Sequence, residues 1–99
     1  MQIDFEGDGL RRLYEDPDFV DRRIGPDLGK AFRRKVGYIV AAVDERDLRA
    51  LKSLHYEKLA GRRFGQHSIR LNDQWRLIVR IGSNVDGRVV IIIEIVDYH

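Results

Sequence analysis

The sequence predicts an α+β fold in which an N-terminal strand and two or three helices pack on a curved antiparallel C-terminal sheet. Two patterns of apolar residues support this prediction. Apolar residues recur at helical spacing from Leu28 to Val43, whereas from Phe64 onward they alternate with a period of two. At 99 residues the chain has the size of one compact domain, so we expect a single domain over residues 1–99.

The N-terminal segment is expected to form a short strand and a first helix. From Gln2 to Phe5, apolar residues alternate with polar ones, which is typical of a strand. Asp8 is a candidate N-cap for a helix that bears Leu10 and Leu13 on one side. Pro17 would end that helix.

A longer second helix is expected to begin at Gly25 and Pro26, because proline fits the first helical position. One apolar stripe runs along it, formed by Leu28, Phe32, Val36, Ile39, Val40 and Val43. This stripe predicts the main packing helix of the fold. Residues 33–35, two arginines and a lysine, fall mostly outside the stripe, so we expect them on a solvated face.

A third, shorter helical pattern lies between Asp44 and Leu54. Leu48, Leu51 and Leu54 would share one side of it, and Asp47 is its candidate N-cap. The pattern changes to alternation soon after this segment, so we expect no further long helix.

The alternating segment predicts an antiparallel hairpin followed by one more strand. Asn72 and Asp73 separate its two arms, and both residue types tolerate the left-handed backbone that a two-residue hairpin turn needs. Trp75 is expected on the inner, core-facing side. Arg76 and Arg80 would then share the opposite face. A second turn is expected at residues 86–87.

The last strand leads to three proton-handling side chains. An almost wholly apolar run from Val89 to Val96 predicts a buried strand, and Asp97, Tyr98 and His99 follow it directly. A polar tail on a core strand would give the same pattern, since chain ends are usually solvated. A functional role gains support from the basic segment Arg62 to Arg80, which could supply cations near the strand's end.

Charge is distributed unevenly, although the formal net charge is only +2. Residues 1–21 contain seven acidic residues against two arginines, whereas residues 58–80 contain six cations against Asp73 alone. Those cations are Lys58, Arg62, Arg63, Arg70, Arg76 and Arg80. The planar fork of arginine suits bidentate binding of phosphate oxygens, although a solvated sheet face would also explain the cluster.

The composition argues against several classes of protein. No stretch of about 18 apolar residues is present to span a membrane, and the acidic start of the chain does not resemble a signal sequence, so a cytoplasmic location is expected. The chain has no cysteine, and its three histidines lack a ligand spacing, so we expect neither a metal site nor a cofactor. His55 and His67 are expected to be surface or hydrogen-bonded residues.

The residue types around the last strand suit metal-free cleavage of RNA. The 2′-hydroxyl of RNA can attack the adjacent phosphate if a base accepts its proton, and an acid must protonate the departing 5′-oxygen. In this hypothesis His99 is the acid or base, Asp97 orients a partner or accepts a proton, Tyr98 stacks on a base, and Arg76 holds the phosphate. Along an extended strand, Asp97 and His99 point to one face and Tyr98 to the other, so convergence would require a twist.

Two segments resemble a known family. The run YEKLAGRRFGQHSIRLNDQWR, from Tyr56 to Arg76, and the ending EIVDYH are similar to the HigB-type toxins of the RelE/ParE superfamily. The resemblance is strong over roughly the last 45 residues. It implies a RelE-like fold and a ribosome-dependent mRNA endonuclease that needs no cofactor. It also implies a helix-turn-helix, HigA-like antitoxin as partner, with operator DNA contacted only through that antitoxin.

The resemblance also assigns residues to roles. It implies that Arg76, Asp97, Tyr98 and His99 are catalytic. It places contacts with RNA or the ribosome on the basic segment, which includes Lys58, Arg62, Arg63, Arg70 and Arg80.

The chain departs from the family pattern at Ala60, where many HigB-like toxins have a lysine before the glycine that is Gly61 here. Lys58 or the neighbouring arginines could replace that cation, and a subgroup resembling the toxin GraT shares the small residue. Two alternatives stay open. The first is a toxin that inhibits a protein target such as DNA gyrase without cleaving RNA, against which the terminal acid, tyrosine and histidine argue. The second is a regulatory module that binds the antitoxin or RNA without cleaving it, which the missing lysine keeps open.

Overall fold

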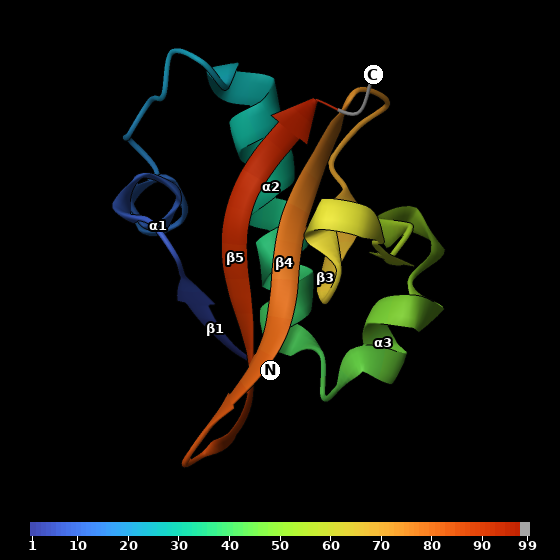
Figure 1. The fold of residues 1–99 in the computed structure, drawn as a ribbon. Helices are drawn as coiled ribbons and strands as arrows, with labels where there is room; N and C mark the ends of the chain where they lie inside the picture. Colours follow the sequence, from blue (N-terminus) through green and yellow to red (C-terminus); the bar gives the residue numbers. More distant parts are fainter. Residues whose placement is uncertain (98–99) are drawn as a thin grey trace.

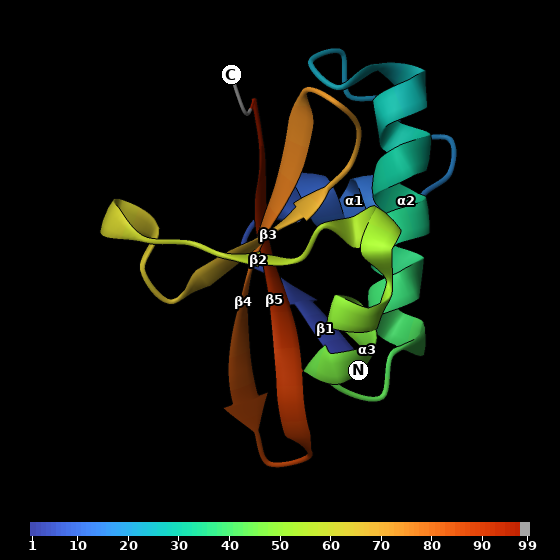
Figure 2. The same ribbon diagram turned by 90° about the vertical axis from the view of Figure 1, so that its right-hand side faces the viewer.

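The computed structural model describes residues 1–97 as a five-stranded sheet with helices on one face (Figures 1 and 2). The strands are β1 (Gln2–Phe5), β2 (Glu57–Lys58), β3 (Gln66–Arg70), β4 (Trp75–Asn84) and β5 (Gly87–Asp97). They lie in the order β1-β5-β4-β3-β2. The predicted antiparallel meander is confirmed in β3, β4 and β5, while β1 pairs parallel to β5, so the sheet is mixed.

The helical layer covers one face of the sheet, and we call the other face the open face. The helices are α1 (Asp8–Glu15), α2 (Gly25–Ala41) and α3 (Glu45–Ala50), with two short 3-10 turns, η1 (Lys52–Leu54) and η2 (Gly61–Arg63). Figure 2 shows α2 and α3 on one side of the strands, and the loop that contains η2 projecting on the opposite side. This arrangement leaves the open face available for a ligand.

The helix α2 is the main packing helix, as its apolar stripe predicted. Its core side chains meet those of β4 and β5 in one cluster, which includes Leu28, Phe32, Val36, Ile39, Leu77, Val79, Val90 and Ile92. Val40 and Val43 are 45% and 83% exposed, so the prediction was wrong for them. Four residues of an α-helix turn through roughly 400°, so each step of four from Leu28 toward Val40 points about 40° further away from the core. Val43 lies beyond the end of the helix. Neither α2 nor any other described helix is long and apolar enough to cross a membrane.

Two of the three cations at positions 33–35 are structural, which corrects the expectation of a solvated face. Lys35 is 5% exposed, and its Nζ donates to the backbone oxygen of Ser53 at 3.2 Å. Burial lowers the pKa of Lys35. Arg33 Nε donates to the backbone oxygen of Leu13 at 2.7 Å, so it joins α2 to α1. Only Arg34 is exposed, because position 35 lies seven residues after the start of the stripe and faces inward.

The helix starts differ from the predicted caps. Gly7 is the N-cap of α1, and Asp8 is its first helical residue, where a carboxylate favours the positive end of the helix dipole. Asp44 caps α3 by accepting a hydrogen bond from the Arg46 backbone N–H at 2.9 Å. The predictions of Asp8 and Asp47 as caps were therefore wrong, because each lies one or more residues inside its helix.

The turn between β3 and β4 is longer than the two-residue turn predicted for it. The strands are joined by residues 71–74, and neither Asn72 nor Asp73 has a positive φ. The Oδ1 atom of Asn72 instead accepts hydrogen bonds from the backbone N–H groups of Gln74 and Trp75, at 2.9 and 2.8 Å. A side-chain acceptor therefore closes this turn in place of a left-handed backbone.

A bulge in β5 decides which side chains reach the open face. In the register, Ile78 pairs with Glu94 and Val79 pairs with Ile92, so Ile93 is an extra residue. Regular alternation from the buried Ile92 would have turned Glu94 toward the core. Because of the bulge, Glu94 shares the open face with Ile78 instead.

Candidate active site

Arg76 lies on the open face of β4, and its guanidinium group is fixed by three neighbours. Nε and Nη2 both donate to the Ser68 hydroxyl oxygen, at 3.1 and 2.8 Å, and Nη2 also donates to the backbone oxygen of His55 at 2.7 Å. A Glu57 carboxylate oxygen lies 3.7 Å from Nη2. The Arg76 side chain is only 7% exposed, so these contacts hold a cation just beneath the open face.

Strand register and one strained residue bring these partners together. Ser68 pairs with both Glu57 and Ile78, so it shares a face with them and with Arg76. His55 has φ +44°, a left-handed conformation that is uncommon for a residue with a side chain. This conformation ends η1 and presents the carbonyl of His55 to Arg76. The His55 side chain is exposed, as expected.

Two further predicted cations lie on the same face of the sheet. Arg70 pairs directly with Arg76 in the register and forms an ion pair with Asp73 at the turn. Arg80 is exposed four residues after Arg76, and its guanidinium lies near Gly82. The prediction that Arg76 and Arg80 share the face opposite Trp75 is confirmed.

The η2 loop adds two arginines at the edge of the open face. Arg63 forms an ion pair with Glu94 and donates to Gln66 Oε1 at 3.1 Å, so the loop is tied to β3 and β5. Arg62 is exposed beside it, and among residues 1–97 it forms no hydrogen bond or ion pair. Five of the predicted cations therefore lie on one side of the sheet.

Asp97, the acidic candidate of the last strand, does not lie on the face of the sheet that carries Arg76. Asp97 pairs with Trp75, so its side chain starts from the face opposite to Arg76, and its Oδ2 accepts from Gln74 Nε2 at 3.0 Å. Tyr98 and His99, the other two candidates at this end, lie outside the described residues. Asp97 and Arg76 therefore lie at the same end of the neighbouring strands β5 and β4, but their side chains start from opposite faces of the sheet.

Lys58 is also on the helix side of the sheet, because its register partner is His67. The His67 ring stacks on Tyr56, with ring centroids 4.7 Å apart and an angle of 4° between the planes. Burial lowers the pKa of His67 and raises that of Tyr56 to about 12. Within the described part of the chain, His67 Nδ1 and Tyr56 OH are buried without a hydrogen-bond partner. His67 is thus a packing residue, which the sequence did not predict.

Within the described part of the chain, acidic and histidine side chains are dispersed. In residues 1–97, no three His, Asp or Glu side chains are grouped so that they could hold a metal ion.

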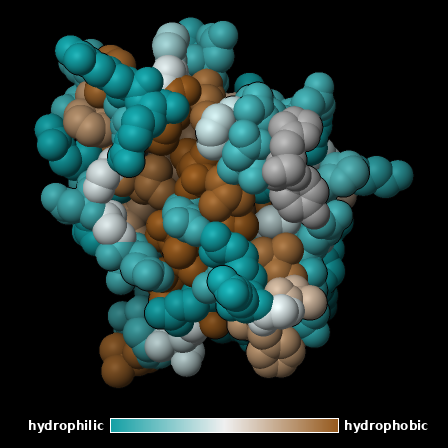
Figure 3. Space-filling model, turned by 45° about the horizontal axis from the view of Figure 1, so that its top comes forward, coloured by the Kyte–Doolittle hydropathy of each residue, from teal (hydrophilic) through white to brown (hydrophobic). Residues whose placement is uncertain are grey.

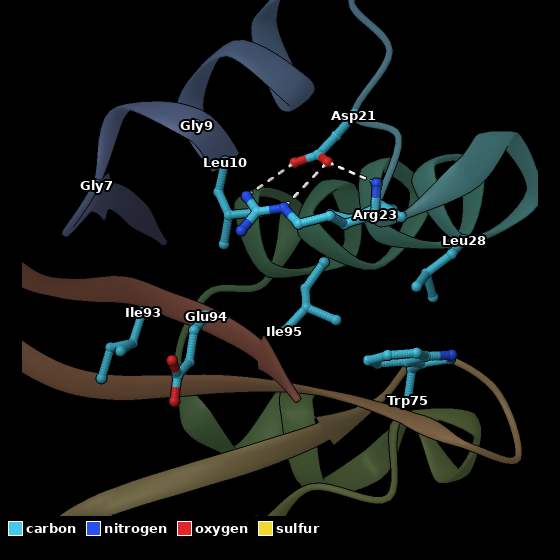
Figure 4. Close-up of a pocket in the computed structure, with 11 residues that line it drawn as sticks. Gly7, Gly9, Leu10, Asp21, Arg23, Leu28, Trp75, Ile93, Glu94 and Ile95 are labelled. Atoms are coloured by element: carbon cyan, nitrogen blue, oxygen red, sulfur yellow. Dashed lines mark hydrogen bonds and ion pairs between the residues drawn. The ribbon is translucent and has the colours of Figure 1, made fainter. Parts of the chain in front are cut away.

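An apolar pocket of about 450 Å³ lies at the end of β5, on the helix side (Figures 3 and 4). Its apolar lining includes Leu10, Leu28, Trp75, Ile93 and Ile95, and Asp21 and Arg23 stand at its rim. Figure 4 shows the Arg23 side chain turned back onto Asp21, and these hydrogen bonds lower the pKa of the Asp21 carboxyl. The sequence did not predict this pocket, because it forms only where α1, α2 and β5 meet.

Sequence reasoning also missed the residues that hold Arg76. Ser68 and Glu57 are ordinary polar residues in the sequence, and His55 takes part through its backbone. The alternation of Ser68 and Arg70 was the available signal for a shared face, but it did not reveal which side of the hairpin faces the core.

Comparisons with known proteins agree with the fold and the earlier resemblance. Residues 3–99 match the family model described as "RelE-like toxin of type II toxin-antitoxin system HigB". The chain is 38% identical over 78 residues to "Toxin HigB-1" of Vibrio cholerae serotype O1, a match that covers 79% of this chain and 81% of that protein. The solved structure of a YoeB/ParE toxin from Agrobacterium tumefaciens superposes with a TM-score of 0.60, at 13% identity and over 100% of both chains. That likeness concerns the fold alone and agrees with the predicted RelE-like architecture.

Proposed function

The chain belongs to the HigB-like toxins of type II toxin–antitoxin systems, and we propose that it is an endoribonuclease that cuts mRNA on the ribosome. The observation that supports this most directly is Arg76, a cation fixed by Ser68 and His55 on an arginine-rich face. Negative charge increases on the phosphoryl oxygens as a phosphodiester is cleaved. A guanidinium that is already in place stabilises this charge without reorganising.

The reaction uses the 2′-hydroxyl of the RNA as the nucleophile. Its oxygen forms a bond to the adjacent phosphorus while the bond from phosphorus to the 5′-oxygen breaks, which gives a 2′,3′-cyclic phosphate and a 5′-hydroxyl end. A base removes the 2′ proton and an acid protonates the departing 5′-oxygen. We assign these proton transfers to His99 and Asp97, the stacking of a base to Tyr98, and the charge stabilisation to Arg76. Because Asp97 starts from the face opposite to Arg76, this assignment requires a twist that brings the two side chains to one phosphate.

The remaining cations bind the RNA backbone or the ribosome in this proposal. Arg62, Arg63, Arg70 and Arg80 lie along the open face, so they can contact successive phosphates, while Lys58 would contact RNA from the edge strand β2. Such contacts predict binding that weakens steeply with salt.

An antitoxin partner follows from the family. We propose that it is a helix-turn-helix protein of the HigA type, and that the toxin reaches operator DNA only through it.

The test is to map the 5′ ends of mRNA in a reconstituted translation reaction, with ribosomes present and with ribosomes omitted. We expect cuts only on translated message. Arg76→Lys retains the charge but loses the planar fork, so it should slow cleavage by about 10²-fold. The matched control is Arg88→Lys, since Arg88 pairs with Glu45 at an exposed position and should cut normally.

The outcomes separate the hypotheses. Cuts on bare RNA would make the protein a ribosome-independent nuclease. The absence of cuts in either reaction would overturn the proposal and favour a protein target such as DNA gyrase, which a supercoiling assay would reveal. Full cleavage by Arg76→Lys would show that the planar fork is not needed, and full cleavage by Arg76→Met, which has no charge, would remove Arg76 from the mechanism.

A further inference from the structure

Phe64 is a large apolar residue that the fold leaves outside the core. Its side chain is 84% exposed, and it follows Arg62 and Arg63 in the loop between β2 and β3. From Lys58 to His67 the chain has three cations and no acidic residue. Single exposed apolar residues are common on proteins, so the surroundings of Phe64 are what matter.

The loop that presents Phe64 has a defined shape. Gly61 and Gly65 on either side of it have φ +64° and +89°, a region that favours glycine. The Phe64 N–H donates to the Gly61 oxygen at 3.1 Å, and the Leu59 N–H donates to the Gln66 oxygen at 3.0 Å. These hydrogen bonds close the loop and fix the backbone at Phe64.

The loop stands on the same side of the sheet as Arg76. Figure 2 shows it projecting away from the helical layer, and its Arg63 reaches Glu94 on the open face. An RNA strand that extended across the open face from Arg76 toward Arg63 would reach the loop that carries Phe64 and Arg62.

We propose that Phe64 stacks on an unpaired base of RNA while Arg62 contacts the neighbouring phosphate. An aromatic ring beside cations, with no acidic residue near it in sequence, has the chemistry of single-stranded nucleic acid sites. Val85 provides a contrast, because it is fully exposed at the β4–β5 turn but is followed by Asp86 instead of cations. This inference rests on the proposed function, since it assigns a second RNA contact to the same face.

The test measures the binding of a fluorescent single-stranded RNA whose 2′-hydroxyls are methylated, so that it cannot be cut. Phe64→Ala should lower the affinity by about five- to 100-fold, because a stacked base is lost. Phe64→Trp should bind at least as well as the wild type, whereas Phe64→Leu should resemble the alanine variant. Val85→Ala is the matched control and should bind normally.

Salt dependence separates the two roles. Arg62→Ala should reduce the slope of log affinity against log salt by about one, because one phosphate contact is lost. Phe64→Ala should leave that slope unchanged. The same variants are also tested on vacant ribosomes. A loss on the oligonucleotide indicates a base of the message, and a loss only on ribosomes indicates a base of ribosomal RNA; both support stacking on RNA.

Three results would overturn the inference. The first is equal RNA and ribosome binding by Phe64→Ala and wild type, and the second is full binding by Phe64→Leu. The third is a variant that loses only its affinity for the antitoxin, which would make Phe64 a protein contact. If the wild type itself binds neither RNA nor ribosomes, the proposed function fails together with this inference.

Discussion

Ser68→Ala is expected to loosen Arg76, which would keep its contacts with His55 and Glu57. Ser68 is fully buried, and its Oγ accepts two N–H groups of Arg76, at 3.1 and 2.8 Å. A hydrogen bond to a charged group contributes about 1.5–3 kcal/mol. Because both bonds share one oxygen, together they should contribute less than two independent bonds. We expect the free energy of unfolding to fall by about 2–4 kcal/mol. The free energy of unfolding of a chain of this size is about 5–15 kcal/mol, so the variant should stay folded.

Urea denaturation measures this effect against a matched control. Ser83→Ala makes the same chemical change at an exposed position of β4 and should alter the free energy of unfolding by less than about 0.5 kcal/mol. A double-mutant cycle with Arg76→Met should give a coupling of at least about 1.5 kcal/mol, since the serine has no guanidinium to hold in that background. In the cleavage assay, Ser68→Ala should lower kcat by about tenfold or more, because a displaced Arg76 stabilises the transition state less well.

Unfolding of Ser68→Ala and Ser83→Ala at the same urea concentration would show that Ser68 does not stabilise the fold through Arg76. Additive effects in the cycle would also refute this role of Ser68, because they would show that Ser68 does not hold Arg76.

Two further predictions concern the hairpin turn and pH. Asn72→Ala should lower the free energy of unfolding by about 1 kcal/mol, because it removes the acceptor for the backbone N–H groups of Gln74 and Trp75. Asn72→Asp keeps an acceptor and should retain most of the stability. An equal loss in both variants would show that the side-chain oxygen does not stabilise the turn. Burial lowers the pKa of His67 below its ordinary value of 6.5, so the unfolded chain binds more protons than the folded chain at acidic pH. The free energy of unfolding should therefore fall as the pH drops below about 6.5, by up to about 1.4 kcal/mol per pH unit. His67→Phe should reduce this slope between pH 7 and pH 5, and identical slopes for the variant and wild type would contradict it.

Local periodicity was sufficient to predict the main elements of the fold. The strand at Gln2–Phe5, the apolar stripe of α2 and the apolar run of β5 each repeat a pattern within one element. The prediction that the whole run from Val89 to Val96 is buried was wrong, because only Val89, Val90 and Ile92 are buried. Such patterns depend on neighbours in the sequence, so the sequence alone reveals them. Lys35 shows the limit of such patterns. Its hydrogen-bond partner is the backbone oxygen of Ser53, and no local pattern predicts that Ser53 lies beside α2.

The surroundings of Arg76 could not be predicted, because they depend on hairpin register. A two-residue turn at residues 72–73 would have paired Ser68 with Leu77 and turned the serine toward the core. The side-chain-closed turn of Asn72 shifts the register by one residue, so Ser68 pairs with Ile78 and reaches Arg76. The bulge at Ile93 has a similar effect on Glu94, and nothing in the apolar run of β5 marks where the extra residue falls.

The parallel pairing of β1 with β5 joins residues 2–5 to residues 89–92. These two segments leave the ribosome far apart in time, since synthesis adds about 5–20 residues per second and the interval is therefore on the order of ten seconds. During that interval β1 has no strand beside it, and β4 lacks the neighbour that completes the meander. Contacts between such distant residues also form slowly. The sheet is therefore complete only after β5 has been synthesised, and β1 can take its place in the sheet only then.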